Sequence, residues 1–169
     1  MGLLLLVASC SWIGPGRRPA ASLGLGSADR QDPTLSGDGR WLASIVPRGG
    51  RETVLLQEQA SGRVVPLRPL MRHQPHRSPS LSWNGRYLAV LVQWGNRPTA
   101  VIADRLTGRL LPLPLPGEGD PERLSLAPDA RRLAVERVRS GQRRIELFDL
   151  GGLIEPDPPM GQAVGGPQP

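Results

Sequence analysis

Short apolar runs alternate with polar turns through the middle of this chain, and the same alternation occurs three times. Each copy has a Leu before a tight polar turn and a Leu-Ala pair after it, and the copies begin at Leu35, Leu81 and Leu126. They are therefore 46 and then 45 residues apart. A fixed period of about 40 to 50 residues with short strand-like segments is typical of stacked β-sheet units such as propeller blades. The pattern predicts an all-β fold.

The turn within each copy favours a β-hairpin. The pairs Asp38-Gly39 and Asn84-Gly85 lie between apolar runs and suit a two-residue turn, which needs positive φ at its central positions. The third copy has Ala130 where the others have Gly, so we expect a turn of altered geometry there, based on a preceding Pro-Asp pair. The residues to which we assign a structural turn role are Asp38, Gly39, Asn84, Gly85, Pro128 and Asp129.

The segments after the turns have the composition of strands. In the middle copy, residues 87–92 are apolar on both faces, so we expect both faces of that strand to be covered. The last copy instead alternates Leu133 and Val135 with Arg132 and Glu136. This leaves one polar face, as a terminal repeat requires for solubility. The third copy is expected to cap the stack.

A second half-repeat completes each unit. Pro66 and Pro112 occupy equivalent positions, and a proline cannot donate its ladder hydrogen bond, so the fourth strand should be an outer edge. We therefore predict a partial β-propeller of three four-stranded antiparallel blades, at about 31–76, 77–121 and 122–155.

The repeated phrase also resembles a known family. Leu-Ser-x-Asp-Gly-Arg-aromatic-Leu-Ala, followed some twenty residues later by an aliphatic strand and Thr-Gly-Arg, is similar to the blade repeat of TolB-like β-propellers over residues 31–155. That group includes the periplasmic TolB protein of the Tol-Pal envelope system and the propellers attached to prolyl-oligopeptidase-type hydrolases. The resemblance implies a propeller, although propellers typically have four to eight blades and this chain has room for three.

The first ten residues resemble an export signal. Residues 1–9 are apolar and end in small residues before Cys10, the only cysteine, and Val-Ala-Ser-Cys resembles the lipobox of bacterial lipoproteins. This resemblance implies lipid attachment at Cys10 and a periplasmic, membrane-anchored protein. No basic residue precedes Cys10, so a start site within a longer signal and an ordinary buried strand remain alternatives. We expect residues 10–30 to be a tether and 156–169 a disordered tail, because both are rich in Gly and Pro.

The net charge and the candidate chemical groups restrict which functions the sequence can support. The net charge is +6 and all 21 basic residues are arginine, which suggests either an anionic partner or solvated arginines that recur with the repeat, as Arg40, Arg86 and Arg131 do. His73 and His76 are the only histidines, with no Cys, Asp or Glu nearby in sequence and with flanking arginines that would repel a cation. We therefore expect a solvated loop between blades rather than a metal site. There is no Gly-x-Ser-x-Gly elbow and no phosphate-binding Gly-Lys loop. We assign no catalytic, cofactor or metal residue.

The leading hypothesis is a non-catalytic binding or scaffold module of the bacterial cell envelope that mediates protein–protein interaction. Its expected partners are an envelope protein and the membrane through Cys10, with no specific nucleic acid. We expect either an open three-blade array or a dimer in which a second copy completes a six-blade ring. One alternative is arginine-mediated binding of an anionic polymer or lipid headgroup. Another is an accessory propeller of a hydrolase whose catalytic domain is a separate chain.

Overall fold

The computed structural model describes residues 29–161, in which strands alternate with turns and no α-helix is present. The first group comprises β1 (Gln31–Leu35), β2 (Trp41–Arg48), β3 (Arg51–Glu58) and β4 (Val64–Val65), followed by the 3₁₀ helix η1 (Arg68–Arg72). The second comprises β5 (His76–Leu81), β6 (Tyr87–Trp94), β7 (Arg97–Asp104) and β8 (Leu110–Pro112). The third comprises β9 (Asp120–Leu126), β10 (Arg132–Arg139) and β11 (Gln142–Asp149). None of the described residues forms a helix of the length and apolarity needed to cross a bilayer.

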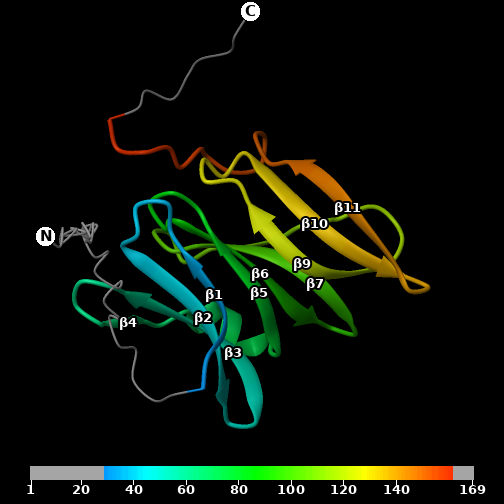
Figure 1. Cartoon of the computed structure of the whole chain (residues 1–169), viewed down its shortest axis with the longest axis horizontal. Helices are drawn as coiled ribbons and strands as arrows, with labels where there is room; N and C mark the ends of the chain where they lie inside the picture. The colour runs from blue at the N-terminus through cyan, green and yellow to red at the C-terminus, as the bar shows by residue number, and fades with distance from the viewer. Residues whose placement is uncertain (1–28, 162–169) are drawn as a thin grey trace, which may run out of the picture.

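Each group forms one antiparallel sheet with its strands in chain order, and the three sheets stand side by side as blades (Figure 1). The predicted all-β partial propeller is therefore confirmed. The first two sheets have four strands, and Pro112 lies in the edge strand β8, as expected. The third sheet has three strands in the described part of the chain rather than the expected four. Three glycines and three prolines occur in residues 150–161 after β11, and this composition does not support another strand.

The turn between the first two strands of a blade is longer than the predicted two-residue hairpin. In the first blade, the Ser36 N–H donates to the Trp41 carbonyl and the Gly39 N–H to the Ser36 carbonyl, both at 2.9 Å. A β-turn and one left-handed residue thus connect β1 with β2. Gly39, Gly85 and Ala130 have φ values of 70°, 64° and 62°, so the third turn does not differ as expected. Ala130 is 1% exposed, and burial of its methyl group offsets part of the strain of this conformation.

The middle blade packs against a hydrophobic core on each of its faces. Residues 88, 90 and 92 of β6 belong to the core shared with the first blade, and residues 87, 89 and 91 to the core shared with the third. All six are at most 3% exposed. The alternation along this strand predicted this arrangement, because successive side chains of a strand point to opposite faces.

The third blade is not the purely polar cap that we expected. Leu133 and Val135 of β10 are fully buried, as predicted, but Ile145 and Leu147 of β11 are 75% and 71% exposed. Ile145 pairs across the strands with Glu136, on the side away from the core. The prediction failed because it considered β10 alone, whereas β11 contributes two apolar residues to the same face.

Side-chain oxygens link the innermost strands of neighbouring blades. The Leu124 N–H of β9 donates to Ser78 Oγ of β5, and the Leu126 N–H donates to Ser80 Oγ, both at 2.8 Å. The Ser78 N–H donates in turn to Asp32 Oδ2 of β1 at 3.3 Å. Each bond joins residues 46 positions apart, which equals the spacing of the first two repeats and is one residue more than the spacing of the last two.

Several predictions concern the ends of the chain. The signal-like segment, Cys10 and most of the expected tether lie outside the described residues, and the last described residue of that tether, Arg30, donates to Gln57 at 3.1 Å. The predicted disordered tail needs correction for its first residues. Asp157 is 5% exposed and accepts a hydrogen bond from the second blade. Hydrogen bonding fixes this segment although its composition is poor in core-forming residues.

Candidate binding site at the turns of the second and third blades

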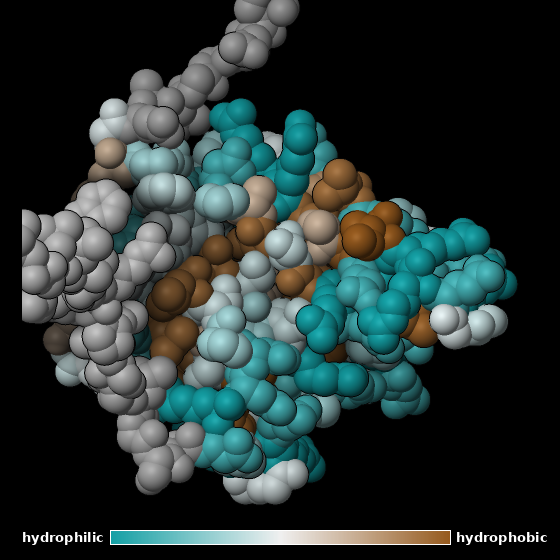
Figure 2. Space-filling model, viewed as in Figure 1, coloured by the Kyte–Doolittle hydropathy of each residue, from teal (hydrophilic) through white to brown (hydrophobic). Residues whose placement is uncertain are grey.

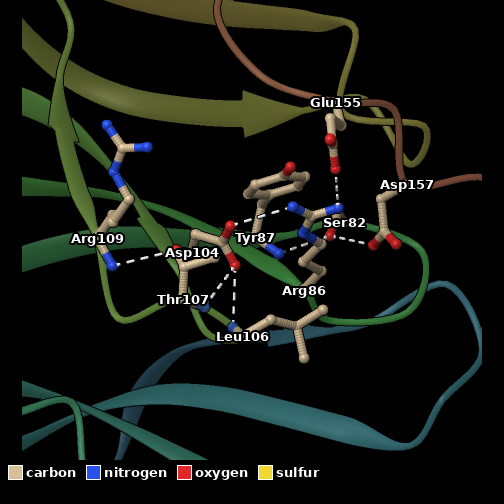
Figure 3. Close-up of polar contacts among 9 residues, drawn as sticks. All are labelled: Ser82, Arg86, Tyr87, Asp104, Leu106, Thr107, Arg109, Glu155 and Asp157. Carbon is tan, nitrogen blue, oxygen red and sulfur yellow. Dashed lines mark hydrogen bonds and ion pairs between the residues drawn. The ribbon is translucent and has the colours of Figure 1, made fainter.

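An arginine between two carboxylates occupies the centre of the polar site in Figure 3. Arg86 follows the turn after β5, and its Nη1 donates to Glu155 Oε2 at 2.7 Å. Its Nη2 donates to Asp104 Oδ2, at the end of β7, at 3.2 Å. The guanidinium carbon lies 4.8 Å from the centre of the Tyr87 ring. Arg86 therefore joins β6 and β7 to the segment that follows β11.

These groups carry fixed charges. Burial alone lowers the pKa of Arg86, but the hydrogen bonds to Glu155 and Asp104 outweigh it and raise that pKa. Burial likewise acts to raise the pKa of Asp104, and hydrogen bonds from Arg86 and from the Leu106 N–H outweigh it, so the Asp104 pKa is lowered. A general acid or base works best with a pKa near the working pH. The arrangement is suited to binding rather than to proton transfer.

A cavity of about 300 Å³ lies beside this network. Its wall includes Arg86, Asp104, Arg109 and Glu155 together with the aliphatic side chain of Ile154. Binding sites for small groups and peptides commonly combine an apolar wall with a few converging polar groups. The site can therefore hold a ligand that has both charged and apolar parts.

The predicted turn residues Asp38 and Asp129 stabilise their own turns. Asp38 Oδ1 accepts hydrogen bonds from the Arg40 N–H at 3.0 Å and from the Ser36 hydroxyl at 2.5 Å. Asp129 Oδ1 accepts from the Arg131 N–H at 3.0 Å. In both blades the carboxylate satisfies backbone donors within the turn, as Asp commonly does at such positions.

Asn84 holds the equivalent position in the second blade and has a distant partner. The Asn84 N–H donates to Asp157 Oδ2 at 2.9 Å, and Asn84 Nδ2 donates to Asp157 Oδ1 at 3.0 Å. The Ser82 hydroxyl donates to the same Oδ2 at 2.5 Å, and Asn84 Nδ2 also donates to the Pro158 carbonyl at 2.6 Å. Figure 3 shows the Ser82 hydroxyl and the Asp157 carboxylate facing each other beside Arg86.

The remaining predicted turn residues join neighbouring blades or shape a turn. A Cβ atom on Gly85 would lie 2.5 Å from Trp41 Cδ1, so the first blade packs directly on this glycine. The Pro128 carbonyl accepts a hydrogen bond from the Trp83 N–H at 2.6 Å and thereby links the third blade to the second. Gly39 has no neighbour within 4 Å of such a Cβ, so its role is conformational.

His76 does not lie in a solvated loop, which corrects the expectation for that residue, whereas His73 lies in the bend between η1 and β5 and is half-buried. His76 is fully buried: its Nδ1 accepts from the Val54 N–H at 3.0 Å and its Nε2 donates to the Leu70 carbonyl at 2.9 Å. Burial lowers the pKa of His76 and favours the neutral ring. His73 stacks on Trp94 with ring centres 4.0 Å apart. A ring with both nitrogens paired can be buried at little penalty.

Within residues 29–161, no three His, Cys, Asp or Glu side chains are grouped in a way that could hold a metal ion. Carboxylates pair with arginines instead. Glu58 is within 3.7 Å of both Arg40 and Arg63, and Glu146 accepts from the buried Arg137 at 2.8 Å. The pairs of Glu58 are ion pairs within the first blade, and the Arg137–Glu146 pair is a charge-assisted hydrogen bond within the third.

The sequence reasoning missed three residues of this site, namely Asp104, Glu155 and Asp157. One available signal was the second repeat itself, because Asn84 replaces the carboxylate that the other two turns carry. The other was the acidic pair within the proline-rich segment after β11. Nothing local in the sequence indicates that these two features meet.

Comparison with solved structures places the fold. TolB from Acinetobacter baumannii superposes with a TM-score of 0.60 at 16% identity, over 72% of this chain and 30% of that protein. A putative TolB from Agrobacterium tumefaciens gives 0.62 at 20% identity, over 76% and 46% of the two chains. The β-propeller domain of the Trilobed protease from Pyrococcus furiosus gives 0.56 at 16% identity, over 78% and 41%.

No protein-family model and no curated protein sequence matches the chain. The chain spans less than half the length of each of the three solved structures above. At these identities the likeness concerns the fold, and the three sheets with their repeated turns agree with it. The protein thus has the fold of three blades of a TolB-type β-propeller.

Proposed function

We propose that this chain is a non-catalytic protein-binding module of the bacterial cell envelope. The observation that carries the proposal is the outer face of the third blade, where Ile145 and Leu147 are 75% and 71% exposed. Figure 2 shows apolar surface at this position over β11. Adjacent exposed apolar residues on a sheet face are characteristic of interaction surfaces.

Neighbouring residues establish which way this face points. Phe148, which alternates with Leu147, packs against the core shared with the second blade, and Glu146 binds the buried Arg137. Ile145 and Leu147 therefore point away from the core, and Leu147 pairs across the strands with Ala134, which extends the apolar surface. In the other two blades, a comparable apolar face is covered by the next sheet.

The partner that we propose for this face is a second copy of the chain. A six-blade ring would need the outer side of the first blade to be free, but Leu42 and Ser44 on that side are only 6% and 1% exposed. The third blade offers more apolar surface. We therefore favour a twofold pairing of third blades, in which the same patch meets itself.

The oligomeric state tests this proposal. The wild-type chain should have the mass of a dimer by gel filtration with light scattering at micromolar concentration. The double variant Ile145→Glu/Leu147→Glu should be monomeric, because two charges cannot be buried unpaired in the interface. As a matched control, Leu106→Glu alters another apolar side chain that is 65% exposed and should leave the mass unchanged. A monomeric wild type, or a double variant that still dimerises, would refute the pairing.

Envelope placement belongs to the same proposal. Two features support it: the fold that the chain shares with TolB proteins, and the lipobox-like sequence before Cys10. We propose attachment to the membrane through a lipid on Cys10, which lies outside the described residues. Acyl chains contribute about 0.8 kcal/mol per buried CH₂ to such attachment.

A further inference from the structure

The second blade differs from the others in the source of its turn carboxylate. In the first blade, Asp38 accepts from the backbone of its own turn and from the Ser36 hydroxyl. In the second blade, Ser82 and Asn84 present three hydrogen-bond donors: a hydroxyl, a backbone N–H and an amide NH₂ group. Their own turn contains no acidic residue that could accept these bonds. A carboxylate is the group that complements such a set of donors.

Asp157 fills this position from outside the blade. Its two carboxylate oxygens accept the three hydrogen bonds from Ser82 and Asn84, and the side chain is almost completely buried. Its own N–H donates to the Asp129 carbonyl of the third blade at 2.9 Å. The segment thus gives Ser82 the carboxylate partner that Asp38 gives Ser36, while the backbone donor to the carboxylate differs: it is the Arg40 N–H in the first blade and the Asn84 N–H in the second.

A second acidic residue extends the recognition. Glu155 lies two positions before Asp157 and binds Arg86, which Asp104 holds in place. Asn84 also donates to the backbone carbonyl of Pro158, so the site contacts the peptide backbone as well as the two carboxylates. These contacts define a ligand of the form Glu-Pro-Asp-Pro, an acidic peptide with prolines that limit its backbone freedom.

We propose that Ser82, Asn84 and Arg86 form a binding site for acidic, proline-containing peptides, which residues 155–158 of this chain occupy in cis. A segment of the same chemistry from a partner protein occupies it when the cis segment leaves. Residues 155–158 belong to no strand, so their departure breaks no sheet hydrogen bonds. The covalent connection gives the cis segment a high effective concentration, so it competes strongly with any separate peptide.

A labelled peptide with the sequence of residues 153–160, Leu-Ile-Glu-Pro-Asp-Pro-Pro-Met, tests the site by fluorescence anisotropy. We expect the full-length Asp157→Ala variant to bind this peptide at least tenfold more tightly than the wild type, since its cis segment no longer fills the site. The near-isosteric Asp157→Asn repeats the measurement with a smaller change to the fold. Circular dichroism verifies that both variants are folded.

Two controls establish specificity. Adding Asn84→Asp to Asp157→Ala should abolish binding, because this turn then carries its own carboxylate, as the first and third turns do. A peptide with Asn in place of its Asp should also fail to bind. The proposal would be overturned if the wild type and the folded Asp157 variants bound the peptide with equal affinity, or if these variants did not bind it. It would also be overturned if the Asp-containing and Asn-containing peptides bound equally well. These residues differ from the apolar pair of β11, so the result is independent of the dimer test.

Discussion

Two buried residues show how single positions hold the blades together. Gly85 combines a φ of 64° with direct contact from Trp41, so a side chain there would be both strained and in collision with the first blade. His76 uses both ring nitrogens to join β3 to the residues of η1. At both positions, the contact between blades depends on one residue type.

His76 makes stability depend on pH. Its pKa is lowered by burial in the folded protein and lies near 6.5 in the unfolded chain, so below pH 6.5 the unfolded state binds more protons. The free energy of unfolding should therefore decrease as pH falls below about 6.5, by up to about 1.4 kcal/mol per pH unit until the folded pKa is reached. Above that range, this residue should contribute no pH dependence.

Urea unfolding monitored by circular dichroism between pH 5 and pH 8 measures this effect. His76→Gln should be less stable than wild type at neutral pH and should lose most of the slope below pH 6.5. His73→Gln leaves His76 in place, so this variant should retain the slope of stability against pH below pH 6.5. If His76→Gln showed the full wild-type slope, another group would be responsible.

At the scale of elements, β10 holds the loop between the second and third blades through one side chain. Arg137 is 4% exposed, and it donates through Nε to Glu146 at 2.8 Å and through Nη1 to the Gly119 carbonyl at 3.0 Å. Its Nη2 donates to the carbonyls of Leu115 and Pro116 at 3.1 and 3.0 Å. The planar guanidinium is needed because a lysine cannot reach four acceptors in these directions.

Arg137→Lys should therefore lower the free energy of unfolding by about 2 to 4 kcal/mol, since the buried guanidinium and its hydrogen bonds to three backbone carbonyls and Glu146 are lost. The measurement is a urea denaturation curve, supported by faster proteolysis within residues 114–119. Arg143→Lys is the matched control: Arg143 pairs with Glu136 and Glu122 on the exposed face of the same blade and should tolerate the change. Equal stability of Arg137→Lys and wild type would show that these contacts contribute little.

At the scale of the whole molecule, the charge of +6 is partly organised within the blades. Arginines that recur with the repeat bind carboxylates of their own sheet: Arg40 binds Glu58, and Arg86 binds Asp104. These pairs place opposite charges side by side, while the net charge of +6, which already counts every carboxylate, is unchanged. Binding of an anionic polymer therefore stays an alternative to protein binding.

The proposed anchor also concerns the whole molecule. Growth of the bacterium with a labelled fatty acid should label the wild-type protein and leave Cys10→Ala unlabelled, because Cys10 is the only cysteine in the chain. Ser11→Ala retains the thiol and should be labelled like the wild type. The readout is label in the purified band per amount of protein. Equal label in wild type and Cys10→Ala would end the lipoprotein proposal.

Features that follow from local periodicity could be predicted from the sequence. The three-unit architecture came from the 46- and 45-residue spacing, and the two buried faces of β6 from its unbroken apolar run. The edge position of β8 came from Pro112. These features depend on the pleat of a strand and on the chemistry of proline, and both act within a few residues.

The tertiary structure alone decided the candidate site and the surface of the last blade. Asn84 and Asp157 are 73 residues apart, and no local pattern brings them together. The exposed pair on β11 became visible only once its register with β10 was known. Composition suggested that Asp157 belongs to a disordered tail, yet three hydrogen bonds from one turn bury it. Sequence periodicity determines toward which face of the sheet a side chain points, whereas the packing of distant segments determines which residues contact that face.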